Sequence, residues 1–563
     1  MIILFKKPIE FFLIFSIGLS FLYGVLSYQH YSPSSHDFYI NTISFFICSL
    51  GIIVFFFKKN KLHIKLNSIL WILIFFILLI QPVINNIIYV DGLIFPLAQI
   101  LFVLVLSVAI SNISDKEYFI KKMAMILIVS SLFLFFTQIF HVFKIFSLVE
   151  IMRLPLQTQR FSGNLFQPNQ TAFVFVLGVI SIILLLETNR FFFLKYICII
   201  FLSIGVALTA SRAGFVMLLL FSLIFNIYIN YFNRKNIFVV KYFFFSLLGL
   251  IIGICLYSYV SEKQTVFGRI STSFDDVRWN LLHQTGLIIL DHPFKGVGWK
   301  NFASTGLQYY EQIGWLGLTD HSHFIFGQIL SEFGLLGLIL ILFFSYVLIK
   351  NIFLIKNVYD AFILIVLLVF VVYSCFEYPL WYFRYLMIFS IFLSLFDKKE
   401  DSIYIIDKGY LISFIGLFLS LSSIYYAYQY RQLAYVNDVV FDTNISNKVK
   451  FEKILNTNFS FGFSYFNDLF LYQTISADGF FLKESIEVGE RLINYIPLNE
   501  YLIKQGTLVG LDKQKVKSYK YFKASCYYHG GTECENTKLY LKELARSYPE
   551  YFESIYKKID SNF

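Results

Sequence analysis

Apolar segments recur along the first three quarters of the chain, and most of them are long enough to cross a lipid bilayer. Runs such as FVLVLSVAI and LLGLILILFFSYVLI carry no charged residue, and a helix needs about 20 apolar residues to cross a hydrocarbon core. Of the 563 residues, 58% are hydrophobic and 15% are charged, whereas soluble domains carry roughly 25% charged residues. The sequence therefore predicts an all-α polytopic membrane protein.

We predict thirteen membrane-spanning helices. The first follows Lys6 and Lys7 without a small-residue cleavage site, which favours a retained helix over a removed signal peptide. The predicted spans are 9–27, 38–57, 67–84, 93–112, 123–141, 169–187, 193–209, 213–231, 242–260, 324–349, 357–375, 379–396 and 409–427.

Basic residues set the predicted orientation. With the N-terminus inside, nineteen Lys and Arg residues fall in the inner loops, against Lys144, Arg153, Arg160 and Arg212 in the short outer loops. Positive residues concentrate on the cytoplasmic side of membrane proteins. The same asymmetry accounts for the formal net charge of +10, so we expect no nucleic-acid partner.

Two larger segments fall on the predicted outer side, the loop 261–322 and the tail 428–563. The tail has amphipathic helical patterns such as KESIEVGERLINYIPLNEYL, which resemble those of helical-repeat domains but show no clean 34-residue period. We therefore expect a transmembrane domain at residues 1–427 and a C-terminal α-helical domain at residues 428–563.

Two cysteines of the tail, Cys526 and Cys534, flank a Gly-Gly turn in CYYHGGTEC. Oxidising conditions outside the cytoplasm would allow a disulfide that closes this short loop. A zinc site that includes His529 is the alternative, although it lacks a fourth ligand.

Four stretches rich in polar or aromatic residues gather on the predicted outer face. Ionisable residues at a membrane edge are candidates for function, so we expect the site there, within reach of membrane lipids. The stretches are RFSGNLFQPNQ at 160–170, ASRAG at 210–214, DHSHFIFGQILSEFG at 320–334 and FEYPLWYFRY at 376–385.

Arg160 and Arg212 each precede a glycine by a few residues. Glycine permits a close approach of the backbone, and a guanidinium suits bidentate phosphate binding. Two such arginines that converge would form a diphosphate clamp. Contact with lipid head groups is the alternative interpretation of an arginine at a membrane edge.

Five further side chains in these stretches are candidates for the site. Gln167 and Asn169 begin a predicted span, where they would cap the helix or orient a sugar or phosphate oxygen. Tyr378 and Tyr382 fit an aromatic belt at the membrane surface. Glu377 lies beside them, and an aromatic belt does not require its carboxylate.

His321 and His323 begin another predicted span. Residues two apart on a helix point in very different directions, so we do not expect them to share a metal. The sequence has no HExxH spacing, and we expect no metal and no cofactor. A histidine here suits general-base catalysis or hydrogen bonding near neutral pH. Asp275 and Asp276 are a weaker alternative site, for a divalent ion.

These residues match the pattern of a known family. His323, followed by Gln328, Glu332, Gly334 and Gly337 in the form Q-x-x-x-E-x-G-x-x-G, resembles the Wzy_C superfamily of bacterial O-antigen ligases, polymerases and protein O-oligosaccharyltransferases. The QPN at 167–169 and the EYPLWY at 377–382 are similar to motifs of the PglL-type protein O-oligosaccharyltransferases. The resemblance covers roughly residues 1–430. The chain departs from it at Phe324, where the family often has asparagine.

The resemblance implies a GT-C-like enzyme of the bacterial inner membrane whose active site faces the periplasm. Its donor would be an undecaprenyl-diphosphate-linked glycan, and its acceptor a Ser or Thr hydroxyl of an exported protein such as a type IV pilin. His323 would be catalytic, and two arginines would bind the donor diphosphate. The implied supporting or substrate-binding residues are Gln167, Asn169, His321, Glu377, Tyr378 and Tyr382.

Two other functions are alternatives. An O-antigen ligase or polymerase would use the same donor with a saccharide acceptor. A transporter of lipid-linked oligosaccharide belongs to a different class. Transporters place polar residues near the middle of the membrane, often in repeated halves, whereas the polar stretches here gather at one face.

The predicted topology can be tested with reporter fusions at Lys399 and Asn437. The excess of basic residues in the inner loops predicts a cytoplasmic signal from the first fusion and a periplasmic signal from the second. Equal signals from the two positions would contradict the thirteen-span topology.

Overall fold

The computed structural model describes most of the chain. The described residues are 8–33, 37–59, 61–145, 160–186, 192–232, 240–261, 277–317, 319–397, 401–457, 459–475 and 481–563. Arg153, Asp275 and Asp276 lie outside these ranges, so the alternative divalent-ion site is not among the described residues.

Each predicted span coincides with a helix. Within the described residues, ten helices are long and apolar enough to cross a membrane, and three shorter apolar helices (α8, α16 and α17) account for the other predicted spans. The expectation of an all-α polytopic membrane protein is confirmed. The helices are α1 Pro8–Leu26, α2 Phe38–Phe57, α3 Leu66–Ile84, α4 Ile94–Ser111, α5 Lys116–Val142, α7 Pro168–Leu186, α8 Phe192–Leu208, α9 Arg212–Phe232, α10 Lys241–Val260, α15 Ile325–Ile352, α16 Val358–Ser374, α17 Phe383–Leu395 and α18 Gly409–Phe441.

The chain divides into two compact units. Unit 1 comprises residues 1–73, 98–275 and 342–430, and unit 2 comprises residues 74–97, 276–341 and 431–563. The domain boundary that we expect after residue 427 falls inside α18, and it stays a prediction.

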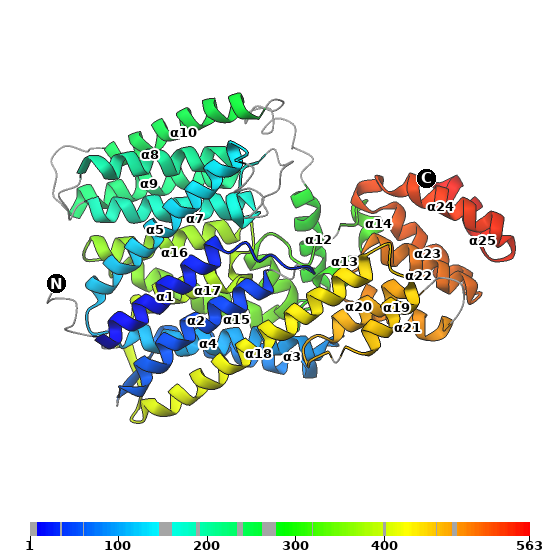
Figure 1. The fold of residues 1–563 in the computed structure, drawn as a ribbon, viewed down its shortest axis with the longest axis horizontal. Coiled ribbons are helices and arrows are strands. Elements are labelled where there is room, and N and C mark those ends of the chain that lie inside the picture. Colours follow the sequence, from blue (N-terminus) through cyan, green and yellow to red (C-terminus); the bar gives the residue numbers. More distant parts are fainter. Residues whose placement is uncertain are drawn as a thin grey trace. The chain divides into compact units, whose positions relative to one another are not determined.

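Unit 1 is a bundle of apolar helices in which α7 is buried along most of its length. Within this unit α7 packs on α5, α8, α9 and α16, and α10 packs on α8 and α9 (Figure 1). Small residues allow the close approach: a Cβ added at Gly253 of α10 would lie 2.5 Å from the Cβ of Ala207 on α8. Because consecutive spans alternate in direction, the C-terminal ends of α1, α5, α8 and α16 share one side with the N-terminal ends of α2, α7, α9 and α17.

Two short strands occur in predicted inner loops of unit 1. Strand β1 (Leu62–Lys65) pairs antiparallel with β2 (Ser402–Ile406), with Leu62 opposite Ile406. Paired strands lie on the same side of a membrane, so this ladder agrees with the placement of both loops on one side.

The part of unit 2 that precedes the tail contains the end of α3, the start of α4, the first part of α15 and several short helices. The short helices are η2 Val90–Leu93, α12 Val277–Asp291, α13 Phe302–Gly306 and α14 Tyr310–Ile313. The short helices η3 Gly163–Leu165 and η4 Pro379–Trp381 belong to unit 1.

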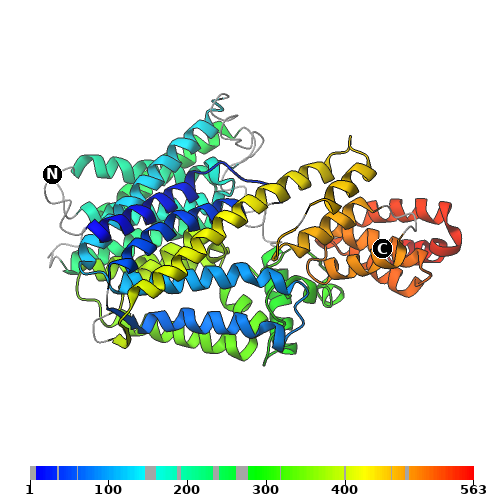
Figure 2. The same cartoon turned by 60° about the horizontal axis from the view of Figure 1, so that its bottom comes forward.

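The tail of unit 2 is helical, and neighbouring helices pack in chain order, as Figure 2 shows for the orange-to-red end. Its last helices enclose an apolar core of Phe522, Leu541, Phe552 and Ile559. The tail helices are α19 Asn447–Leu455, α20 Ser464–Thr474, α21 Leu482–Ile493, α22 Asn499–Leu511, α23 Lys515–Cys526, η6 His529–Gly531, α24 Cys534–Ser547 and α25 Pro549–Asn562.

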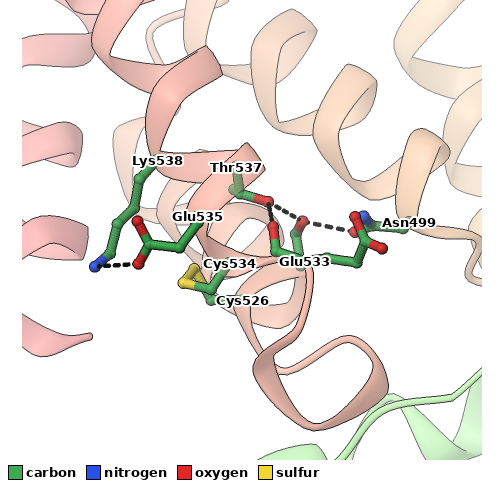
Figure 3. The surroundings of a disulfide bond; sticks show 8 residues. Asn499, Cys526, Glu533, Cys534, Glu535, Thr537 and Lys538 are labelled. Atoms are coloured by element: carbon green, nitrogen blue, oxygen red, sulfur yellow. Dashed lines mark hydrogen bonds and ion pairs between the residues drawn. A yellow bond between two sulfur atoms is a disulfide. The ribbon is translucent and has the colours of Figure 1, made fainter.

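A disulfide joins Cys526, the last residue of α23, to Cys534, the first residue of α24 (Figure 3). Both cysteines are buried in the core of the tail. Beside them, the Ser525 hydroxyl donates to Asn499 Oδ1 at 2.6 Å and lies 2.8 Å from the hydroxyl of Thr537. The turn between α23 and α24 is therefore held by a covalent bond and by buried polar contacts.

We expect mass spectrometry of non-reduced, alkylated protein to find Cys526 and Cys534 in one linked peptide. Replacement of both by serine should destabilise the tail by about 2–3 kcal/mol, because the bond closes a short loop that is unconstrained in the unfolded chain. Limited proteolysis of the membrane-embedded protein measures this loss. Two alkylated thiols in the native protein would contradict the expectation.

Candidate functional site

The first of two polar clusters lies in unit 1 and joins the stretch 160–170 to the stretch 376–385. The Arg160 guanidinium donates from Nη2 to Asn169 Oδ1 at 2.7 Å, and Asn169 Nδ2 donates to Glu377 Oε1 at 2.6 Å. Hydrogen bonds to charged groups are short and orient both partners. We call Arg160, Asn169 and Glu377, together with Arg212, the arginine cluster.

The start of α7 explains how Asn169 reaches both partners. Phe166 adopts a left-handed conformation with φ 60°, and α7 then begins at Pro168, a residue suited to the first helical position. The Gln167 side chain accepts the N–H of Gln170 at 2.7 Å. Gln167 therefore caps the helix, whereas the side chain of Asn169 bonds other motifs.

Arg212 belongs to the same end of unit 1. Arg160 Nε donates to the carbonyl of Thr209 at 2.9 Å, in the turn that leads into α9. The hydroxyl of Ser211 accepts the N–H of Gly214 at 3.2 Å, which caps α9 at its first residue, Arg212. Arg212 is exposed. It directly follows the turn that contains the Thr209 carbonyl, which accepts the hydrogen bond from Arg160.

The glycines near the two arginines allow close packing between helices. A Cβ at Gly214 would lie 2.6 Å from the Cβ of Ala172 on α7, and one at Gly163 would lie 2.6 Å from Thr137 Oγ1 on α5. Gly163 also has a φ of +58°, which favours glycine. These contacts explain both glycines without the close approach to a ligand that the sequence suggested.

A second layer of unit 1 supports the arginine cluster, and sequence reasoning missed it. Arg384 Nη2 donates to Asp37 Oδ2 at 2.8 Å and to Gln170 Oε1 at 2.7 Å. Asp37 Oδ1 lies 2.8 Å from His30 Nδ1, and His30 Nε2 lies 2.8 Å from the carbonyl of Asn164. His30 therefore bridges the Asp37 carboxylate and the backbone of Asn164.

The charge of Asp37 follows from these partners. Burial alone would raise its pKa, but the Arg384 guanidinium and His30 hold the pKa of this carboxyl well below its usual range. Asp37 therefore stays ionised and keeps Arg384 beside Gln170, the residue that follows Asn169.

Tyrosine rings in and beside the EYPLWY motif pack around Arg384. The rings of Tyr378 and Tyr382 stack with centroids 5.9 Å apart, and the guanidinium carbon lies 4.7 Å from the centroid of Tyr382 and 5.0 Å from that of Tyr385. Such cation–π contacts suit a buried guanidinium. The signal that would have revealed Arg384 is its position within a predicted span, where arginine is costly.

The second polar cluster lies in unit 2 and contains both histidines. Asp320 Oδ1 lies 2.8 Å from His321 Nδ1, and Asp320 Oδ2 pairs with Lys300 Nζ. The rings of His321 and His323 lie 4.2 Å apart between centroids. We call Lys300, Asp320, His321 and His323 the histidine cluster.

The expectation that the two histidines point in different directions is wrong. Both precede α15, which begins at Ile325, so helical periodicity does not apply to them. His323 instead adopts a left-handed conformation with φ 54°, an uncommon state for a residue with a side chain. This turn brings the His323 ring beside that of His321.

The motif residues of α15 hold the loop that carries Lys300. Glu332 Oε1 accepts the N–H of Lys300 at 2.9 Å, and the Glu332 carbonyl accepts the N–H of Gly298 at 2.9 Å. Gln328 Oε1 accepts the N–H of Ser322 at 2.6 Å. Gln328 and Glu332 thus fix the backbone on both sides of the histidine cluster.

Charge balance within the histidine cluster favours an ionised Asp320. Burial lowers the pKa of Lys300, but the Asp320 carboxylate more than offsets burial and leaves that pKa above its usual value. The carboxylate also accepts from His321 Nδ1, which fixes the proton of that ring on Nδ1. Within the ranges that the structure covers, no group of three or more His, Cys, Asp or Glu side chains could hold a metal ion.

Two comparisons relate the chain to known proteins. Residues 197–342, which include Arg212 and the histidine cluster, match the O-antigen ligase family, Wzy_C. The chain is 24% identical over 356 residues to the ComP-specific O-oligosaccharyltransferase of Acinetobacter baylyi. That alignment covers 59% of this chain and 61% of the relative, less than two thirds of its length. The chain is therefore a polytopic membrane protein with a segment that matches the Wzy_C family, and it resembles an O-oligosaccharyltransferase.

Proposed function

We propose that the chain is a glycosyltransferase that moves a glycan from an undecaprenyl-diphosphate-linked donor to Ser or Thr hydroxyls of exported proteins such as type IV pilin. The observation that carries this proposal is the direct hydrogen bonding of Asn169 to both Arg160 and Glu377. It joins the two PglL-type motifs to an arginine at one end of unit 1. We place the enzyme in the bacterial inner membrane, with this end facing the periplasm.

The charges in and behind the arginine cluster favour an anionic ligand. Among the described residues of the cluster and the layer behind it, Arg160, Arg212 and Arg384 are cationic, and Asp37 and Glu377 carry carboxylates. The surplus positive charge suits a diphosphate, and guanidinium groups bind phosphate oxygens in pairs. In this proposal Arg160 and Arg212 contact the donor diphosphate, and Asn169 and Glu377 orient Arg160.

His323 is the proposed catalytic residue. The acceptor oxygen bonds to the anomeric carbon, the bond from that carbon to the diphosphate oxygen breaks, and the lipid diphosphate leaves with the electron pair. His323 takes the proton of the attacking hydroxyl as a general base. His321, held by Asp320 and in ring contact with His323, positions the catalytic ring.

An exchange of groups tests the role of Asn169. Asn169→Asp places a second carboxylate against Glu377 and removes the amide that donates to it, although the new carboxylate can still accept from Arg160. Repulsion between the two carboxylates should displace the group that orients Arg160 and lower glycan transfer about 10–100-fold. The double variant Asn169→Asp, Glu377→Gln restores one amide and one carboxylate with their positions exchanged, so it should recover much of the activity. The intact mass of a co-expressed pilin with a glycan locus measures transfer.

The matched control is Glu117→Gln, which neutralises an exposed glutamate of α5 that pairs with Lys121. It should leave transfer unchanged at equal protein levels. Full activity of Asn169→Asp, or a double variant no better than the single one, would remove Asn169 from the orientation of Arg160.

The assignment of His323 predicts that His323→Ala abolishes pilin glycosylation in a protein that is still inserted. Loss of a general base typically costs about 10²–10⁴-fold in rate. His321→Ala should keep a measurable part of the activity, because His321 acts through its neighbour. The intact mass of the pilin measures the activity of both variants.

An active His323→Ala variant would overturn the assignment, and an inactive His321→Ala beside it would exchange the two roles. If the pilin stays unmodified with the unaltered enzyme while a saccharide acceptor receives the glycan, the chain is an O-antigen ligase or polymerase.

A further inference from the structure

Helix α12 in unit 2 is apolar on two opposite faces. One face, with Leu281 and Ile288, packs in a core formed with Phe302, Tyr309 and Trp315. The other face carries Trp279, Leu282 and Leu290, and Phe294 follows just beyond the helix. We call Trp279, Leu282, Leu290 and Phe294 the α12 face.

The α12 face is strongly exposed. The exposed fraction is 68% for Trp279, 76% for Leu290 and 78% for Phe294. Contiguous exposed apolar side chains of this size mark a contact with lipid or with another protein. Because α12 has 15 residues, it is too short to be a membrane span of about 20 residues. Its exposed side therefore needs an apolar neighbour other than its own core.

The neighbour is indicated by the contact of Phe294 with α15, a helix that meets the length and hydropathy of a membrane span. The Phe294 carbonyl accepts the N–H of Leu335 at 2.9 Å. From Leu335 onward the helix exposes Leu335, Leu338 and Ile339, a spacing that forms one face. Such an apolar row on a membrane span faces lipid, so the α12 face continues a lipid-facing surface.

The boundary between polar and apolar surroundings falls at the same point. Every residue from 325 to 334 of α15 is buried or half-buried, and the polar Gln328 and Glu332 bind the loop of the histidine cluster. The helix kinks at Gly334, with φ 54° and ψ −127°. Exposed apolar residues begin directly after this kink, at the level of Phe294.

We propose that the α12 face inserts into the surface of the bilayer on the side of the histidine cluster. Trp and Phe are residues that settle at the boundary between head groups and acyl chains. The exposed Lys295 and the neighbouring Arg278 flank the face, and basic residues in that position attract lipid phosphates. The helix thereby holds the loop of the histidine cluster at the depth of the head groups, where a lipid-linked substrate presents its polar end.

Quenching of tryptophan fluorescence by brominated lipids tests this inference on the full-length chain, one copy in each lipid nanodisc. The emission that belongs to Trp279 is the difference between the unaltered protein and Trp279→Phe. We expect this difference to fall about twofold or more when the lipids carry bromine on the upper acyl chain, because the indole lies among them.

The matched control is Trp315→Phe, which removes a tryptophan of the same loop that is buried in the core against α12. The emission that belongs to Trp315 should not respond to brominated lipid. Trp279 emission that is unquenched and typical of water would overturn the proposal. Trp279 emission that is unquenched but typical of an apolar site would also overturn it, and would indicate another protein surface as the partner.

Discussion

The arrangement of unit 1 depends on one amide group. Asn169 accepts from Arg160 and donates to Glu377, so its two ends satisfy groups of opposite charge. A carboxylate in its place could not donate, and a basic group could not accept. The adjacent Gln170 accepts from the buried Arg384. The first turn of α7 therefore connects two arginines to two carboxylates from distant parts of the chain.

Unit 2 uses backbone groups for a similar purpose. The loop before α13 packs so closely on α15 that a Cβ at Gly296 would lie 2.3 Å from the carbonyl oxygen of Glu332. That carbonyl is available because the helix kinks two residues later, at Gly334. The glutamate and glycine of the Q-x-x-x-E-x-G-x-x-G motif thus have a structural role: they allow a loop to bind the side of a membrane helix and to present Lys300 to Asp320.

Hydropathy was sufficient to locate every predicted span, because burial in lipid leaves a long and uniform signal. It also placed Arg160, Asn169 and Glu377 on one face. Their direct bonding could not be predicted, since it depends on rotamers at helix ends. The histidines were misjudged because helical periodicity was extended to residues before the helix. The role of Arg384 could not be predicted, because its partner Asp37 lies far away in sequence.

The small sheet of unit 1 has a consequence for the assembly of the protein. Strand β1 ends at Lys65 and its partner β2 begins at Ser402, so the ribosome makes most of the transmembrane chain between them. At about 5–20 residues per second, β1 waits on the order of tens of seconds for its partner. During that time it is an open strand edge of the kind that invites wrong pairing. The ladder can close only after twelve of the thirteen predicted spans have been synthesised, which makes it a late event in biogenesis.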